Sequence, residues 1–231
     1  AYACILDQVF PSDAVTDWEA EVKTLKKASS TPAGTRVVRM VDHYVDEEHD
    51  NCRCIVTTPV CEMTLQDLLE SVASGAGPSY DLQTALRWAS ELADTLHLLH
   101  TTEGCRLYHG DLRPRNIFLY RGSSGGAGSE GLEAYIGDFG IALHNHPFGL
   151  QEEPLLYTTS STVAPELMEP GPHGNGGKDD DTSFDARADV WSWGVVVYAL
   201  LSKSMARVTA ASEELCNEQR RFFLGLLSGS T

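Results

Sequence analysis

The stretch His109-Gly-Asp-Leu-Arg-Pro-Arg-Asn116 decides how this chain is interpreted. It follows a long helical pattern from Leu82 to His100, and it leads directly into the β-like run Asn-Ile-Phe-Leu-Tyr120. A second β-like run, Leu132 to Ile136, is followed closely by Asp138-Phe-Gly140. Each of these two polar motifs therefore lies beside a predicted strand.

Two further motifs follow in the second half of the chain. Ala164-Pro-Glu166 comes after an irregular segment, and Asp189-Val-Trp-Ser-Trp-Gly194 opens an apolar helix predicted from Arg187 to Leu201. A single tripeptide is a weak signal, but four motifs in this order and at these spacings are a strong one. The alternative for each polar residue alone is a turn or a cap, because Asp and Asn are common there.

The order of predicted elements indicates an α+β chain of two lobes, with strands and one helix first and mostly helices afterwards. The first part comprises a strand over residues 1–10, a helix with Thr16 and Glu19 as its capping box, and strands Val37–Val45 and Cys52–Thr58. The second part adds a short helix, Thr64–Val72, the long helix with Leu86, Leu92, Leu96 and Leu99 on its apolar face, and a last helix near Glu213–Leu227.

Composition indicates a globular chain with an acidic surface. The chain has 231 residues, of which 42% are hydrophobic and 22% charged, and this is enough apolar material for a buried core. The net charge of −16 repels phosphate backbones and anionic lipid heads, so we expect no nucleic-acid partner. The longest apolar stretch, Val190 to Leu201, is too short to cross a bilayer, so we expect no membrane insertion.

The six cysteines form neither a CxxC pair nor the dense framework of a small secreted domain. Cys52 and Cys54 alternate in a predicted strand and would face the same side. Together with the lack of a basic leader at the start, this predicts free thiols in an intracellular, cytoplasmic protein. A metal site or a disulfide is the alternative.

Taken together, the four motifs resemble those of the protein kinase family, and of its serine/threonine kinases in particular. The resemblance implies the two-lobed kinase fold, with residues 1–60 as a partial small lobe and residues 61–231 as a large lobe truncated at its end. It also implies ATP and Mg²⁺ as cofactors and a protein substrate phosphorylated on Ser or Thr. Thr159 matches a threonine of serine/threonine kinases, and the 109–116 loop lacks the patterns typical of tyrosine kinases.

Four residues match the positions that perform phosphoryl transfer in this family. Asp111 would hold the acceptor hydroxyl, and Arg113 stands where the family usually has a lysine near the transferred phosphate. Asn116 and Asp138 would bind Mg²⁺, which prefers hard oxygen ligands. These residue types suit the reaction, because its charge-rich transition state is stabilised mainly by positioning and charge neutralisation.

Further residues match structural positions of the family. These are His109 in the catalytic loop, Phe139 and Gly140 beside the metal-binding Asp, Thr159 and Glu166 in the activation segment, and Asp189 at the start of the central helix. In the family, the residue matched by Glu166 pairs with an arginine, which we expect beyond the end of this chain.

In the small lobe, Glu21 resembles the helix glutamate that pairs with the catalytic lysine. Thr57 would be the gatekeeper, and the Thr58 carbonyl and the Val60 amide would contact adenine. Pro59 removes one backbone donor, at a position that the family does not use for adenine. The alternative for this segment is a plain strand at a sheet edge.

The chain departs from the family pattern at three places. Cys4, or Ile5 in a register shifted by one, stands where the catalytic lysine belongs, and Gly110 replaces the arginine of the catalytic loop. The Gly-rich lid is expected before Ala1. These departures favour a rival function, a pseudokinase that acts as a scaffold or allosteric partner of a client protein, while the retained acidic residues favour the enzyme. A third alternative is a lysine outside residues 1–231, supplied from a neighbouring strand. The oligomeric state is left open.

Overall fold

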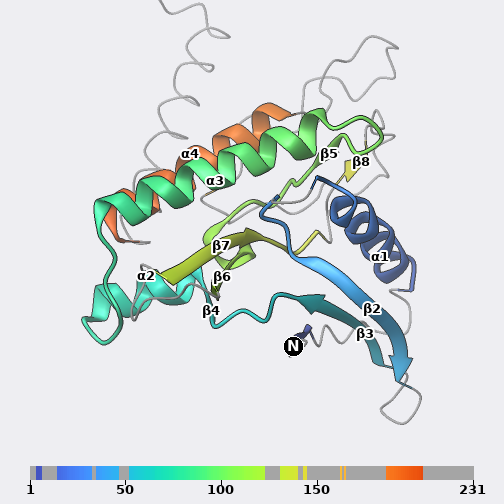
Figure 1. Ribbon diagram of the computed structural model, residues 1–231, viewed down its shortest axis with the longest axis horizontal. Helices are drawn as coiled ribbons and strands as arrows, with labels where there is room; N and C mark the ends of the chain where they lie inside the picture. The colour runs from blue at the N-terminus through green and yellow to red at the C-terminus, as the bar shows by residue number, and fades with distance from the viewer. Residues whose placement is uncertain are drawn as a thin grey trace, which may run out of the picture.

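The computed structural model describes residues 4–6, 15–32, 35–46, 52–122, 131–139, 143–144, 162, 164 and 186–204 (Figure 1). Within these ranges the chain forms four α-helices, one 3-10 helix and eight strands. No helix in these ranges is both long enough and apolar enough to pass through a membrane. Cys54, Cys61 and Cys105 are thiols that form no disulfide bond among the residues described.

The first sheet is antiparallel, with strand order β1-β3-β2. Its strands are β1 (Cys4–Leu6), β2 (Arg39–Asp46) and β3 (Cys52–Thr58), so the bounds predicted for the last strand are confirmed. Helix α1 (Val15–Ser29) connects β1 to β2 and contacts β2. It buries Val22, Leu25 and Ala28, which share one helical face. The helix begins at Val15, so the prediction that Thr16 caps it was wrong, because Thr16 already lies in the first turn.

The second part of the chain contains the other two sheets and the other three α-helices. Strands β4 (Met63–Thr64), β6 (Ile117–Arg121) and β7 (Leu132–Ile136) form one sheet, and β5 (Leu107–Tyr108) pairs with β8 (Leu143–His144). The helices are α2 (Leu65–Ser74), α3 (Leu82–Thr101) and α4 (Ala186–Ser202), with the 3-10 turn η1 (Pro114–Asn116) between β5 and β6.

Local capping determines where α2 begins and ends. The Thr64 hydroxyl accepts a hydrogen bond from the Asp67 amide, and the Asp67 carboxylate accepts one from the Thr64 amide at 2.9 Å. This capping box places Thr64 just before the helix, so the helix starts one residue later than predicted. Gly75 ends the helix with φ 69°, a left-handed conformation that glycine adopts without strain.

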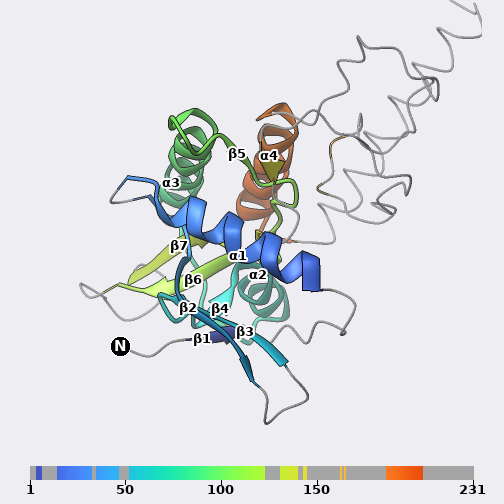
Figure 2. The same ribbon diagram turned by 90° about the vertical axis from the view of Figure 1, so that its right-hand side faces the viewer.

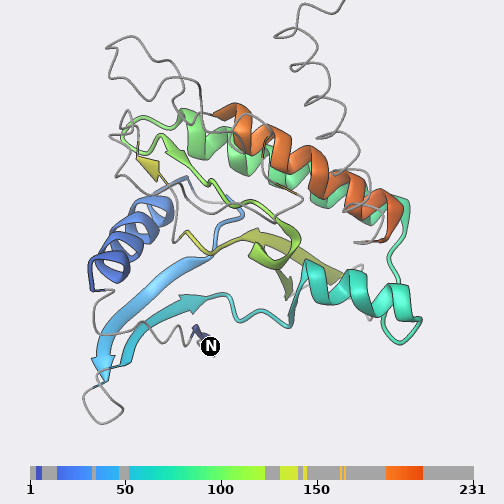
Figure 3. The ribbon, with the colours of Figure 1, turned by 180° about the vertical axis from the view of Figure 1, so that it is seen from behind.

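Helices α3 and α4 contact each other and form a layer on one side of the β6–β7 hairpin (Figures 2 and 3). Helix α3 faces this hairpin with Trp88, whose indole N–H donates to the Leu132 carbonyl at 3.0 Å. Leu92, Leu96 and Leu99 are buried beside it. Leu86 was predicted to share this face but is 52% exposed, because it lies six residues before Leu92, which does not fit the helical repeat.

The segment that follows α1 joins the two halves of the described chain. The Ile136 amide donates to the Arg36 carbonyl, and the Val38 amide donates to the Ile136 carbonyl, both at 2.8 Å. Val37 and Ile136 thereby form a parallel bridge. Strand β7 is therefore held by β6 on one side and by this segment on the other.

Leu92→Ala is expected to lower the free energy of unfolding by about 2–5 kcal/mol, because Leu92 is fully buried and its truncation leaves a cavity. Leu86→Ala, on the exposed face of the same helix, is the matched control and should change stability by less than about 0.5 kcal/mol. Chemical denaturation of both variants measures the difference. Equal losses would mean that α3 does not present the Leu92 face to the core.

Candidate active site

The 109–116 loop is anchored by one buried carboxylate from α4. Asp189 accepts hydrogen bonds from the backbone amides of His109 at 2.8 Å and Gly110 at 2.9 Å. The His100 ring on α3 makes a third contact, with 2.7 Å between its Nε2 and an Asp189 oxygen. A buried carboxylate is costly unless it is hydrogen-bonded, and these three partners meet that need. Asp189, which was predicted to be a structural residue, therefore holds the 109–116 loop against α3 and α4.

The His109 ring connects this loop to the segment that carries Asp138. Its Nε2 lies 3.0 Å from the Gly137 carbonyl, and its Nδ1 accepts from the Asp111 amide at 3.2 Å. Because a carbonyl can only accept, Nε2 carries the proton in this network. The ring also packs on Phe139, with 4.9 Å between the ring centroids. His109 and Phe139, both predicted as structural residues, are thus in direct contact.

Asp111, Arg113 and Asn116 form one hydrogen-bonded group. The Asp111 carboxylate lies 2.8 Å from the Arg113 guanidinium and accepts a hydrogen bond of 3.0 Å from the Asn116 amide nitrogen. That nitrogen also donates to the Asp111 carbonyl at 2.8 Å. Burial raises the pKa of Asp111, whereas Arg113, the Asn116 bond and His109 act to lower it. These three residues are brought together as the sequence motif predicted.

Asp138 is held in an unusual backbone conformation beside this group. Its φ is 60°, which is costly for a residue other than glycine and indicates a conformation imposed by its surroundings. The preceding Gly137 donates to the Asn116 carbonyl at 3.0 Å. A Cβ at residue 137 would lie 2.7 Å from the Phe118 ring, so only glycine allows this close approach. Asp138 also raises the pKa of Asp111 through its charge.

Asn116 and Asp138 suit a Mg²⁺ ion chemically. Both amide hydrogens of Asn116 point to Asp111, so the amide oxygen is oriented away from that residue, and it has no partner among the residues described. Mg²⁺ is typically held by one or two carboxylates together with water and substrate phosphates, and Asp138 would supply such a carboxylate.

Glu21 is a buried acid that faces another acid. It is 3% exposed, and burial raises its pKa to about 7, with the charge of Asp138 adding to the increase. No cation among the described residues lowers that pKa. The expected lysine position lies on β1, where residue 4 pairs with Thr57 of β3. The helix glutamate is therefore retained without its usual partner in this part of the chain.

The predicted adenine contacts lie at the end of β3. Thr57 is buried, Thr58 is exposed and Val60 is half-buried. Residue Thr57 pairs with residue 4 on one neighbouring strand and with Met40 on the other. The position is therefore central in the sheet, and the alternative of a plain edge strand does not fit it. The role of these three residues in holding adenine stays a prediction.

Some predicted residues lie outside the part of the chain that the structure describes. The structure also shows contacts that the sequence did not predict. Gly140, Thr159, Glu166 and the helix near 213–227 lie outside the described residues. The Ser192 hydroxyl donates to the Thr162 carbonyl at 2.8 Å, which ties this position to α4. Neither Ser192 nor His100 was predicted, because the partners are distant in sequence.

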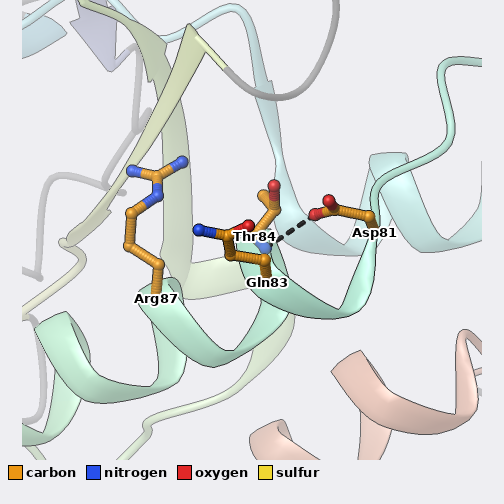
Figure 4. A pocket seen from close by; sticks show the side chains of 4 residues that line it. All are labelled: Asp81, Gln83, Thr84 and Arg87. Atoms are coloured by element: carbon orange, nitrogen blue, oxygen red, sulfur yellow. Dashed lines mark hydrogen bonds between the residues drawn. The ribbon is translucent and has the colours of Figure 1, made fainter.

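A hollow of about 530 Å³ lies elsewhere, at the first turn of α3 (Figure 4). It is lined by Asp81, Gln83, Thr84 and Arg87, and Asp81 caps the helix by accepting from the Thr84 amide at 2.8 Å. The 109–116 loop follows the other end of this 20-residue helix, which is roughly 30 Å long. The hollow is therefore separate from the candidate active site.

Stability should depend on the ionisation of Glu21. Between pH 4.5 and 7 the folded protein holds a proton on Glu21 that the unfolded chain has lost, so rising pH destabilises the folded state by up to about 3 kcal/mol. Glu21→Gln should remove this loss, and Glu19→Gln, an exposed position on the same helix, should keep it. Unfolding free energies in metal-free buffer at pH 5 and pH 8 measure the effect. If the unfolding free energies of Glu21→Gln and wild type changed equally between pH 5 and pH 8, Glu21 would be ionised in both the folded and the unfolded state over this range.

Comparison with known proteins supports the family resemblance that the site motifs indicated. A family model described as the protein kinase domain matches residues 7–224. The chain is 27% identical over 215 residues to serine/threonine-protein kinase 33 of Bos taurus, covering 86% of this chain and 40% of that protein. It is 27% identical over 184 residues to serine/threonine-protein kinase STK11 of Homo sapiens, covering 80% and 37%. A probable inactive receptor kinase of Arabidopsis thaliana is 28% identical over 149 residues, covering 64% and 19%. The chain thus spans at most 40% of the length of these relatives. With its two-lobed α+β architecture and this match, the chain belongs to the protein kinase family.

Proposed function

We propose that the full-length protein transfers the γ-phosphate of ATP to serine or threonine on a protein substrate. The observation that carries this proposal is the convergence of three residues: Asp111 and Asn116 are hydrogen-bonded to each other, and Asp138 follows Gly137, whose amide donates to the Asn116 backbone carbonyl. Two of the similar proteins are named as serine/threonine kinases, which supports this acceptor class. The reduced thiols and the net charge of −16 support an intracellular protein with a protein partner.

In this proposal, the Asp111 carboxylate accepts a hydrogen bond from the substrate hydroxyl and orients it toward the phosphate. Its raised pKa moves the group toward accepting a proton as the hydroxyl reacts. Arg113, 2.8 Å from Asp111, supplies a fixed positive charge beside the site of transfer. Mg²⁺, when bound by Asn116 and Asp138, would neutralise the phosphate oxygens. Thr57, the Thr58 carbonyl and the Val60 amide would position adenine.

The rival function, a pseudokinase that binds a client protein without phosphorylating it, rests on two observations. Glu21 lacks a cationic partner among the described residues, and Gly110 stands in place of the catalytic-loop arginine. One similar protein is itself named as inactive. The enzyme is favoured because the Asn116 amide nitrogen is bound to Asp111 and its amide oxygen has no partner among the residues described, while Asp138 is held in a strained conformation nearby. Such strain persists where the surrounding structure maintains it, often at functional sites.

Phosphotransfer by the full-length protein tests the proposal directly. With radiolabelled ATP and Mg²⁺, label should appear on serine or threonine of the protein itself or of a general acceptor protein. Asp111→Asn should reduce the rate about a hundredfold or more, because the hydroxyl loses its carboxylate partner. Asp94→Asn, an exposed position on α3, should leave the rate unchanged. A rate for wild type no higher than that of Asp111→Asn, in protein that still binds ATP with Mg²⁺, would establish the pseudokinase.

Restoring a lysine on β1 should increase phosphotransfer. Residue 4 pairs with the buried Thr57, so Cys4→Lys is expected to gain up to about a hundredfold in rate by placing a cation near Glu21. Ile5→Lys is the matched control and should gain less, because adjacent strand residues face opposite ways. Adding Glu21→Ala to Cys4→Lys should cancel the gain. A robust wild-type rate that Cys4→Lys leaves unchanged would mean that another lysine already supplies the cation.

A further inference from the structure

Arg36 lies between α3 and β7, outside every predicted site. Its backbone carbonyl accepts from the Ile136 amide at 2.8 Å, and its backbone amide donates to the Thr95 hydroxyl on α3 at 3.2 Å. The residue is therefore tied through its main chain to the end of β7 and to the long helix. Ile136 is only two residues before Asp138.

The Arg36 side chain strengthens the same connection. Its guanidinium donates to the Glu133 carboxylate and, at 3.0 Å, to the Tyr135 hydroxyl, both on β7. It also forms an ion pair with Glu91 on α3 at 3.6 Å, and it lies over the Tyr135 ring, 5.3 Å from the centroid. The Arg36 side chain is 24% exposed, so these contacts are less screened than those of a fully exposed pair.

Strand β7 leads directly into the segment that carries Asp138. Gly137 fits between Asn116, which accepts from its amide at 3.0 Å, and the Phe118 ring, which leaves no room for a side chain. A small shift of β7 along its axis would break this fit and move Asp138 away from Asn116. The position of Asp138 therefore depends on what holds β7.

We propose that Arg36 is a positioning residue that fixes β7, and through it Asp138, in the place required for binding of the Mg²⁺–nucleotide complex. This inference rests on the proposed function, in which Asp138 and Asn116 bind Mg²⁺. Arg36 touches neither the metal nor the nucleotide and acts through Glu133, Tyr135 and Ile136. Replacement of residues that orient metal ligands typically weakens metal affinity by about 10–100-fold.

The test compares ATP binding by the full-length protein with Mg²⁺ and with EDTA, by titration calorimetry. Arg36→Ala should weaken binding with Mg²⁺ about tenfold and leave binding in EDTA unchanged. Arg36→Lys should give an intermediate loss, because lysine can pair with Glu133 but lacks the guanidinium fork. Arg87→Ala is the matched control: Arg87 also contacts Glu91, but it donates to the Leu132 carbonyl at the opposite end of β7. Its affinities should match those of wild type.

A purely structural role for Arg36 would give a different result. Dissociation constants report on the folded molecules, so a variant that only melts at lower temperature would keep both constants, and this would overturn the proposal. Equal weakening with Mg²⁺ and with EDTA would also overturn it, because the effect would then not involve Asp138.

A second measurement does not depend on nucleotide binding. In the nucleotide-free protein, Arg36→Ala should accelerate hydrogen exchange at the Gly137 amide, and Arg87→Ala should not. If wild type bound ATP equally with and without Mg²⁺, the proposed metal site would be wrong, and accelerated exchange at Gly137 would still support the positioning role. Unchanged exchange in Arg36→Ala would end the inference whatever the nucleotide data show.

Discussion

The buried carboxylate of Asp189 is the constraint on which the rest of the site depends. It is inaccessible to solvent, and its oxygens accept from two consecutive backbone amides of the 109–116 loop and contact His100 on α3. Leaving such a charge unpaired would cost several kcal/mol. Because Asp189 on α4 has its partners on α3 and in the loop, α4 packs against α3 and the loop is held in place by the same carboxylate. Gly110 is part of this arrangement, because its φ of 79° suits glycine and would strain an arginine. The departure from the family motif at this position therefore matches the local backbone.

Short contacts connect the loop that Asp189 anchors to the other residues of the candidate site. His109 connects the loop to Gly137 and Phe139, and Asn116 connects it to Asp111 and Gly137. The site therefore contains more acidic than basic side chains. The charge of Asp138 raises the pKa of both Glu21 and Asp111. Among the described residues, Arg113 is the cation that forms an ion pair with Asp111. Acidic groups brought this close favour binding of a cation. A Mg²⁺ ion would supply that positive charge, and so would a lysine on β1.

The sequence could predict the elements and motifs whose signals are local. Strands Cys52–Thr58 and Leu132–Ile136 were predicted to the residue, because alternation and turn residues mark both. The grouping of Asp111 with Asn116 followed from the family resemblance. Leu86 was wrongly grouped with Leu92, Leu96 and Leu99, because a separation of six residues places it on a different face of the helix. Arg36, His100 and Ser192 were missed, because each acts through a partner at least 30 residues away, and a single sequence has no signal for such pairs.

Hydrogen exchange at the His109 and Gly110 amides, measured by NMR, tests most directly whether Asp189 fixes the loop. In Asp189→Asn, one acceptor oxygen is replaced by an amide nitrogen, and the charge that strengthens both bonds is lost. Both amides should then exchange faster by tenfold or more, which corresponds to the loss of about 1.4 kcal/mol of protection. The Thr102 amide, which donates to the Leu98 carbonyl at the end of α3, should keep its wild-type rate. Unchanged exchange at His109 and Gly110 in a folded Asp189→Asn protein would contradict the central role of this carboxylate.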